Sequence, residues 1–141
     1  MEQPAKTLFI KQNKKMKKTL RTLEHETEYQ NYKKSLPKGF CPFCKRDLFR
    51  KEFMFWVLIE NRWWYNDWVM AQNHYLLSPK RHISEFEDLS EEERKEFFLI
   101  KKFLMTSEGG EWESVMENLG DARSIPEHLH FQVLRKFKQF D

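Results

Sequence analysis

The sequence is poor in cysteine, glycine and proline, and each shortage excludes a class of protein. Two cysteines in 141 residues cannot build a disulfide framework. Four glycines and five prolines exclude collagen-like and low-complexity chains. No run of about 18 apolar residues occurs, so we expect no transmembrane helix and no contact with a membrane. The N-terminus also lacks the apolar centre of a secretory signal, which predicts a cytoplasmic protein.

The apolar residues that are present are sufficient for one folded domain. Hydrophobic residues make up 40% of the chain and aromatic residues 16%. The length is that of a single domain, since domains usually have roughly 100–200 residues. Proline and glycine interrupt the chain at Ser35-Leu36-Pro37-Lys38-Gly39. We therefore predict an N-terminal arm of residues 1–38 and a folded domain of residues 39–141.

Positive charge is concentrated in the N-terminal arm. Residues 1–38 hold 10 Lys and Arg against 4 Glu, whereas the rest of the chain has a net charge of −3. Scattered apolar residues after about Lys14 indicate one amphipathic helix within the arm. A basic arm of this kind binds nucleic-acid phosphates or an acidic protein, or it is a solvated helix or tail. The sequence leaves both interpretations open.

The second region begins with short apolar runs. Those at 53–59, 63–65 and 75–77 predict strands, because they are rich in aromatic and β-branched residues. Asn66-Asp67 is a candidate turn, and Pro79 ends the last of these strands, since proline cannot continue a central ladder.

A start signal for a helix follows at Ser90. The hydroxyl of Ser90 can accept a hydrogen bond from an early backbone amide, and the Glu93 carboxylate can reach back to the chain. The apolar residues after this capping box have helical spacing, so we predict a helix over 91–105. Residues 111–118 predict another strand.

The segment 128–134 predicts a strand with one polar and one apolar face. The first face carries His128, His130, Gln132 and Leu134, and the second carries Leu129, Phe131 and Val133. Two residues apart on a strand, the histidines would lie about 7 Å from each other. A lone histidine on a strand is usually structural, but two beside Gln132 favour a functional site.

Cys41 and Cys44 are spaced as Cys-x-x-Cys, which indicates metal or redox chemistry in a cytoplasmic chain. Zinc accepts two thiolates from one tight turn and needs two more ligands. Either His82 or His128 would complete the set, whereas His25 in the arm is a poor candidate. Two free buried cysteines are the alternative, and a redox pair is less favoured because no βαβ pattern surrounds it.

Four blocks of the sequence, in order, resemble the histidine triad (HIT) superfamily. They are Cys41-Pro42-Phe43-Cys44, His74–His82, Asn118-Leu119-Gly120 and His128–Leu134. Together they span about residues 40–135. The resemblance implies an α+β fold, in which an antiparallel sheet carries a packed amphipathic helix and follows the basic, helical arm.

The resemblance also implies a role for each matched residue. A structural zinc ion would be held by Cys41, Cys44, His82 and His128. His130 would attack an α-phosphate and form a nucleotidyl-histidine intermediate, with His74 supporting the imidazole or the phosphate. Asn118 and Ser124 would hydrogen-bond the phosphoryl oxygens or the leaving group. Arg123 and the backbone amides of its loop would stabilise the charge, as phosphoryl transfer requires.

Gln132 stands where the triad pattern has its third histidine. An amide cannot act as a general acid at neutral pH, although it can donate a hydrogen bond to a phosphoryl oxygen. The resulting His-x-His-x-Gln pattern resembles galactose-1-phosphate uridylyltransferase and diadenosine tetraphosphate phosphorylase. It therefore favours nucleotidyl transfer or phosphorolysis over hydrolysis, on a nucleotide, nucleotide-sugar or dinucleotide substrate. Small members of the superfamily commonly form homodimers, so a dimer is expected.

Some assignments stay open at this stage. Asp67 is a candidate ribose ligand or a turn residue, and Trp63 and Trp64 stack on a base or pack in the core. An alternative function is a HIT-fold binding module that has lost its chemistry and docks nucleic acid or a protein through the basic arm.

Overall fold

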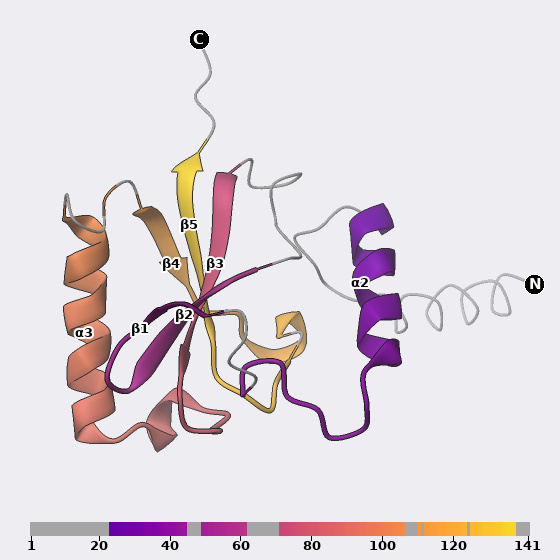
Figure 1. The fold of residues 1–141 in the computed structure, drawn as a ribbon, viewed down its shortest axis with the longest axis horizontal. Coiled ribbons are helices and arrows are strands. Elements are labelled where there is room, and N and C mark those ends of the chain that lie inside the picture. Colours follow the sequence, from indigo (N-terminus) through magenta and orange to yellow (C-terminus); the bar gives the residue numbers. More distant parts are fainter. Residues whose placement is uncertain are drawn as a thin grey trace, which may run out of the picture.

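The fold is an antiparallel five-stranded sheet with one long helix against it, as seen in a computed structural model (Figure 1). The structure describes residues 23–44, 49–61, 71–106, 110, 112–123 and 125–137. The strands are β1 (Phe49–Glu52), β2 (Trp56–Glu60), β3 (Ala71–Pro79), β4 (Trp112–Met116) and β5 (Phe131–Phe137). Their order across the sheet is β1-β2-β3-β5-β4, and every neighbouring pair is antiparallel. The predicted α+β class is confirmed.

The helix α3 (Glu91–Met105) begins and ends where the sequence predicts. Both hydrogen bonds of the capping box are formed, from the Glu93 amide to the Ser90 hydroxyl and from the Ser90 amide to the Glu93 carboxylate. The buried apolar face of α3 packs on the sheet and closes the main core. The core residues of the sheet and helix are Trp56, Leu58, Tyr75, Leu77, Leu89, Phe97, Ile100, Leu104, Leu129, Phe131 and Val133.

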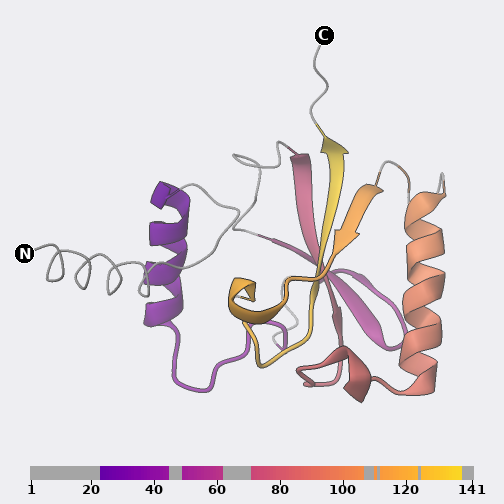
Figure 2. The same ribbon diagram turned by 180° about the vertical axis from the view of Figure 1, so that it is seen from behind.

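The opposite face of the sheet carries a different set of side chains. Because strand residues alternate between faces, Val57 and Ile59 of β2 point away from α3 and pack on Phe43 in a second, smaller cluster. His74 and Gln132, from β3 and β5, are on this face too, and both are buried. The helix α2 (Leu23–Ser35) stands on this side of the sheet, away from α3 (Figures 1 and 2).

The predicted strand over 53–59 is wrong in its first half. Residues 53–55 form a turn between β1 and β2, closed by a hydrogen bond from the Phe53 amide to the Trp56 carbonyl. The turn is held from outside, because the Glu96 carboxylate on α3 accepts hydrogen bonds from the Phe55 and Trp56 amides. The charged segment Phe49–Glu52, for which no strand was predicted, becomes the edge strand β1.

The remaining sequence predictions fall into two groups. The strand predicted over 128–134 begins three residues later, at Phe131, although Leu129, Phe131 and Val133 do face the core. The strand predicted at 111–118 is β4, and β3 ends at Pro79 as expected. The predictions for 63–65, for Asn66-Asp67 and for the first part of the arm, residues 1–22, concern segments outside the described residues.

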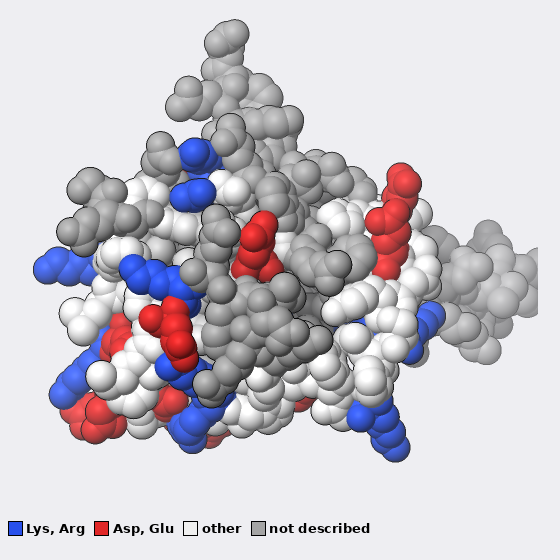
Figure 3. Space-filling view, in the orientation of Figure 1, with Lys and Arg blue, Asp and Glu red and all other residues white. Residues whose placement is uncertain are grey.

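The described surface has no single-sign character on the face shown in Figure 3, where basic and acidic side chains are interspersed. Neither of the described α-helices combines the length and the apolar composition that a membrane span needs.

Candidate functional site

The two cysteines and two of the histidines meet at one place. Cys41 and Cys44 lie on a tight turn that is closed by a hydrogen bond from the Cys44 amide to the Cys41 carbonyl, 3.2 Å. The ligand atoms of Cys41, Cys44, His82 and His128 all lie within 4.8 Å of one another. The structure therefore brings together all four of the predicted metal ligands.

The spacing of these atoms fits a tetrahedral ion. Nδ1 of His128 lies 3.3 Å from Sγ of Cys41 and 3.2 Å from Nδ1 of His82, and Sγ of Cys44 lies 3.3 Å from Nδ1 of His82. A zinc ion at its usual bond lengths to sulfur and nitrogen gives edges of roughly 3.3–3.8 Å between ligand atoms. A Cys₂His₂ donor set is also one that zinc commonly occupies.

The protonation of His128 supports this assignment. Its Nε2 lies 2.9 Å from the Pro79 carbonyl oxygen, which can only accept, so Nε2 carries the proton and Nδ1 keeps a lone pair. Burial lowers the pKa of His128, which favours the neutral ring that a metal ion requires. Desolvation and the neighbouring Cys41 raise the pKa of the Cys44 thiol to about 11, so binding of a cation would release a proton.

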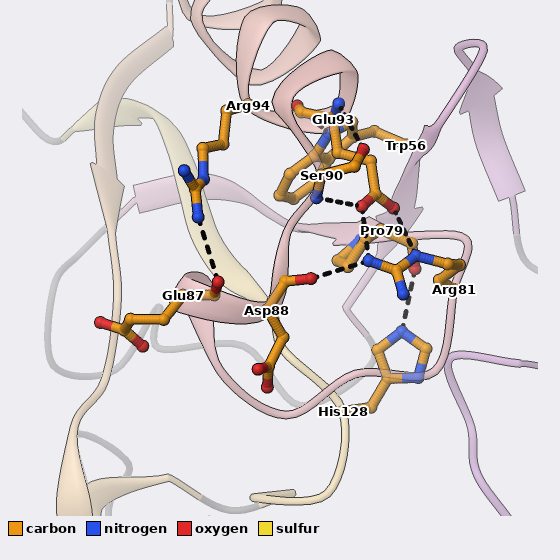
Figure 4. A network of polar contacts seen from close by, with 9 residues as sticks. All are labelled: Trp56, Pro79, Arg81, Glu87, Asp88, Ser90, Glu93, Arg94 and His128. Carbon is orange, nitrogen blue, oxygen red and sulfur yellow. Dashed lines mark hydrogen bonds and ion pairs between the residues drawn. The ribbon is translucent and has the colours of Figure 1, made fainter.

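His82 is placed by the residue before it. The Arg81 guanidinium donates to the Glu93 carboxylate, at 2.7 and 3.1 Å, and to the Asp88 carbonyl oxygen, at 2.8 Å (Figure 4). These bonds fix the segment after β3 to the first turn of α3. The pKa of Glu93 is lowered by its hydrogen bonds with Arg81 and Ser90.

His130 lies two residues after His128, the last residue of the cluster in the sequence. Its Nδ1 donates to the His128 carbonyl oxygen at 2.9 Å, which leaves the lone pair of the ring on Nε2. The ring stacks on Phe43 with 4.6 Å between centroids, and the side chain is buried. Burial lowers the pKa of His130 to about 4, so the imidazole is neutral near pH 7.

A cavity of about 300 Å³ opens beside His130. Its lining combines aromatic, apolar and charged side chains from four stretches of the sequence, within 29–43, 59–61, 76 and 125–132. The lining residues are Tyr29, Tyr32, Lys33, Leu36, Pro37, Lys38, Phe40, Pro42, Phe43, Ile59, Glu60, Asn61, Leu76, Ile125, Glu127, His130 and Gln132. The volume is at the lower end of that of small-molecule sites.

Gln132 lines the cavity, and its side-chain amide is oriented by a hydrogen bond with His74. Nε2 of His74 lies 2.5 Å from the amide oxygen of Gln132, which accepts the hydrogen bond. This bond leaves the NH₂ group of Gln132 as the part that a ligand can use. The amide nitrogen of Asn61 lies 3.3 Å from both ring nitrogens of His74. His74, predicted to support the imidazole or the phosphate, thus lies behind Gln132 and not among the lining residues.

The other predicted ligand-binding residues are not in the lining. Arg123 donates to the Glu85 carboxylate at 2.9 Å and to the Ser84 and Pro126 carbonyl oxygens, so it joins its own loop to the segment that follows β3. Asn118 is partly buried and does not line the cavity. Ser124, like Asp67, Trp63 and Trp64, lies outside the described residues.

Sequence reasoning missed the contribution of the region before the Cys-x-x-Cys motif. Tyr29, Tyr32 and Lys33 of α2 line the cavity, although they were assigned to a basic arm. The amphipathic helix predicted in the arm is present over 23–35 as α2, but it has no apolar stripe, so the prediction was wrong about its character and gave no signal of its packing. The Pro-Lys-Gly sequence after it was a signal for a turn, and that turn brings Lys38 to the cavity.

The HIT domain family matches residues 65–139 of the chain, which is more than half of its length. The protein belongs to the HIT domain family. Solved structures of the same fold support the assignment at the level of architecture. A hypothetical histidine triad nucleotide-binding protein from Sulfolobus tokodaii is 18% identical, with a TM-score of 0.53 and coverage of 71% of each chain.

Two further HIT structures cover most of their own length. A HIT family hydrolase from Clostridium thermocellum is 22% identical with a TM-score of 0.50, over 74% of this chain and 97% of the other. A histidine triad protein from Clostridium difficile is 21% identical with a TM-score of 0.50, over 75% and 98%. No curated protein matches the sequence. Membership of the HIT family supports a nucleotide-related function.

Proposed function

We propose that this HIT protein is a nucleotidyltransferase, a phosphorylase or a hydrolase that works through a nucleotidyl-His130 intermediate. The observation that carries the proposal is the hydrogen bond from Nδ1 of His130 to the His128 carbonyl oxygen, 2.9 Å, on a ring that lines the cavity. This bond places the lone pair of the neutral ring on Nε2, and burial keeps the ring uncharged by lowering the pKa of His130 to about 4, which is what a nucleophile needs near pH 7.

The reaction would proceed in two displacements. Nε2 of His130 attacks the α-phosphorus, a P–N bond forms, and the P–O bond to the leaving group breaks with its electron pair remaining on oxygen. A phosphate, or a water that releases a proton to solvent, then attacks the same phosphorus, the P–N bond breaks, and the pair returns to Nε2. Nδ1 keeps its proton and its bond to the His128 carbonyl oxygen throughout.

Gln132 would stabilise charge and not transfer a proton. Its oxygen is engaged by His74 at 2.5 Å, so its NH₂ group would donate to a phosphoryl oxygen. Because no histidine stands at this position, a leaving group or acceptor that needs no proton is favoured. This supports transfer to, or release of, a phosphate, as in the uridylyltransferase and phosphorylase branch that the His-x-His-x-Gln pattern resembles.

The Cys₂His₂ cluster would hold a structural zinc ion, with Cys41, Cys44, His82 and His128 as its ligands. The ion would supply no step of the reaction, since all four positions are filled by protein. Its effect on this chain would be to fix the backbone of His128, whose carbonyl oxygen orients His130.

A cytoplasmic homodimer is a further part of the proposal. Phe98, Leu99 and Met105 expose apolar side chains on α3, with 60%, 66% and 83% of their surfaces accessible. A second copy of the chain would cover such a surface.

The experiment is intact-mass spectrometry after incubation with UDP-glucose, diadenosine tetraphosphate or ADP. The wild-type protein should gain the mass of one nucleotidyl group, and His130→Ala should gain none and lose activity at least about a thousandfold. His25→Ala, which removes a histidine of α2 outside the cavity lining, is the matched control and should react normally. An adduct that persists in His130→Ala would refute the role of this ring.

The same measurement distinguishes an enzyme from the alternative function, a HIT-fold module that binds a partner but has no catalytic activity. Nucleotide or nucleic-acid binding without any adduct or turnover would favour a HIT-fold binding module. Deletion of residues 1–22 would then show whether the N-terminal arm carries that binding, which should weaken steeply with salt if phosphates are contacted.

A further inference from the structure

One wall of the cavity comes from a part of the chain that precedes the matched HIT segment. Tyr29, Tyr32 and Lys33 of α2 line it, and Lys38 and Phe40 follow. These residues lie before residue 65, where the match to the family begins. They also lie outside the four blocks that resemble the family, so the resemblance assigns them no role.

The helix α2 gains little from hydrophobic burial in its position. It has 13 residues, its only buried side chains are Glu26 and Tyr29, and Leu23 is 84% exposed. An isolated helix of this length is marginal in water, and most helices in proteins are stabilised by a buried apolar face. The segment should therefore have low local stability and respond to whatever binds in the cavity.

Two lysines are brought to the cavity by local structure. The Lys33 ammonium lies 5.6 Å from the centre of the Tyr29 ring, an arrangement that holds it beside a buried aromatic residue. After α2, a turn is closed by a hydrogen bond from the Phe40 amide to the Pro37 carbonyl oxygen, 3.1 Å. Gly39 has φ of +80° at the third position of this turn, and Lys38 is at the second.

The charge of the cavity depends on these lysines. Its acidic lining residues are Glu60 and Glu127, and its basic ones are Lys33 and Lys38. Without the two lysines the lining would be net negative and would repel the phosphates of a nucleotide. Arg123 is not available for this purpose, because it binds the Glu85 carboxylate at 2.9 Å.

We propose that Lys33 and Lys38 are phosphate-binding residues of this site, which hold the phosphate of the leaving group beyond the one that His130 attacks. This inference rests on the proposed function and adds to it two binding residues from α2 and the turn that follows. When the P–O bond to such a leaving group breaks, the electron pair stays on a phosphate oxygen and no proton has to be supplied. Two ammonium groups would stabilise the developing charge, which Gln132 cannot neutralise by proton transfer.

The test compares nucleoside monophosphates with diphosphates, since the β-phosphate occupies the place of the leaving group. Affinities for AMP and ADP, and for UMP and UDP, are measured by titration calorimetry. The wild-type protein should bind at least one diphosphate more tightly than its monophosphate. Lys33→Met and Lys38→Met should each lower that ratio about tenfold, the size of one charge-assisted hydrogen bond, and Lys33→Arg should retain it.

Lys34→Met is the matched control, because Lys34 is the exposed neighbour on the same helix and does not line the cavity. It should leave the ratio unchanged. Hydrogen exchange gives an independent measurement in the unaltered protein: the diphosphate should protect residues 23–38 more than the monophosphate does. The melting temperature of Lys33→Met, compared with that of the wild-type protein, shows whether the variant is folded.

The outcomes separate the two proposals. If the monophosphate binds but the diphosphate binds no tighter and adds no protection, the inference on the lysines is overturned and the proposed function stands. An equal loss in Lys34→Met also overturns it, because the effect would then be one of general charge. If none of these nucleotides binds, both the inference and the proposed function fail.

Discussion

Removal of one exposed histidine should strongly destabilise the protein. His82 is exposed, and substitution of an exposed side chain usually changes the free energy of unfolding by less than about 0.5 kcal/mol. If His82 is a zinc ligand, His82→Ala instead releases the link between the Cys-x-x-Cys turn and the end of β3. The substitution His82→Ala should then lower the free energy of unfolding as much as the loss of a covalent cross-link would.

The size of that effect follows from the loop that the ion closes. Cys44 and His82 are 38 residues apart in the sequence. Treated as a cross-link that reduces the entropy of the unfolded chain, a loop of this length stabilises the folded state by about 4 kcal/mol. The link from His82 to His128 across 46 residues adds no further independent loop, because Cys44 and His128 would stay joined through the ion, so about 4 kcal/mol is the estimate for the loss of His82.

The assay is urea unfolding, followed by tryptophan fluorescence, together with metal analysis. Wild-type protein should contain about one zinc per chain; His82→Ala should lower the free energy of unfolding by about 4 kcal/mol, and a chelator by at least as much. His25→Ala removes a histidine of α2 outside the cluster and should change neither quantity. The reasoning is refuted if wild-type protein carries no metal and His82→Ala unfolds at the wild-type urea concentration.

Two further predictions concern the core and the capping network. Ile100→Ala, at a position only 2% exposed on α3, should cost about 2–5 kcal/mol of unfolding free energy; the neighbouring Leu99→Ala, 66% exposed, should cost less than about 0.5 kcal/mol. Both are measured by urea unfolding, and equal losses would contradict the placement of α3. The lowered pKa of Glu93 means that its ionised form stabilises the fold above the unfolded pKa of about 4.3. That contribution should be lost as the pH falls below this value, and Glu93→Gln should lack this part of the pH dependence; identical pH profiles for the two proteins would contradict it.

The parts of the fold that the sequence predicts well are those whose signals are local. The helix α3 has both ends correct because a capping box marks Ser90 and an uninterrupted helical pattern follows. The alternation of apolar residues around Phe131 correctly separates the two faces of the sheet. In the same way, a short Cys-x-x-Cys turn is a local signal for two metal ligands, although the other two came from a family resemblance.

The errors occur where a distant residue decides the local structure. Residues 53–55 are apolar and resemble a strand, yet the Glu96 carboxylate of α3 binds the Phe55 and Trp56 amides and holds a turn there. Met54, at the tip, is 73% exposed. The contribution of α2 to the cavity could not be predicted from the sequence, because a polar helix that lines a cavity has the same sequence pattern as a helix exposed to solvent.

The placement of His130 shows how the Cys₂His₂ cluster and the core act on one short segment. Residues 128–130 precede β5, so the sheet ladder does not hold them. Instead, Leu129 is buried in the core, its amide donates to the Ile83 carbonyl oxygen at 2.6 Å, and its carbonyl accepts from the Ser78 hydroxyl at 3.0 Å. His128 is fixed on one side by Pro79 and on the other by the cluster. Because the His130 ring takes its orientation from the His128 carbonyl oxygen, any displacement of His128 is passed directly to the ring that we propose as the nucleophile.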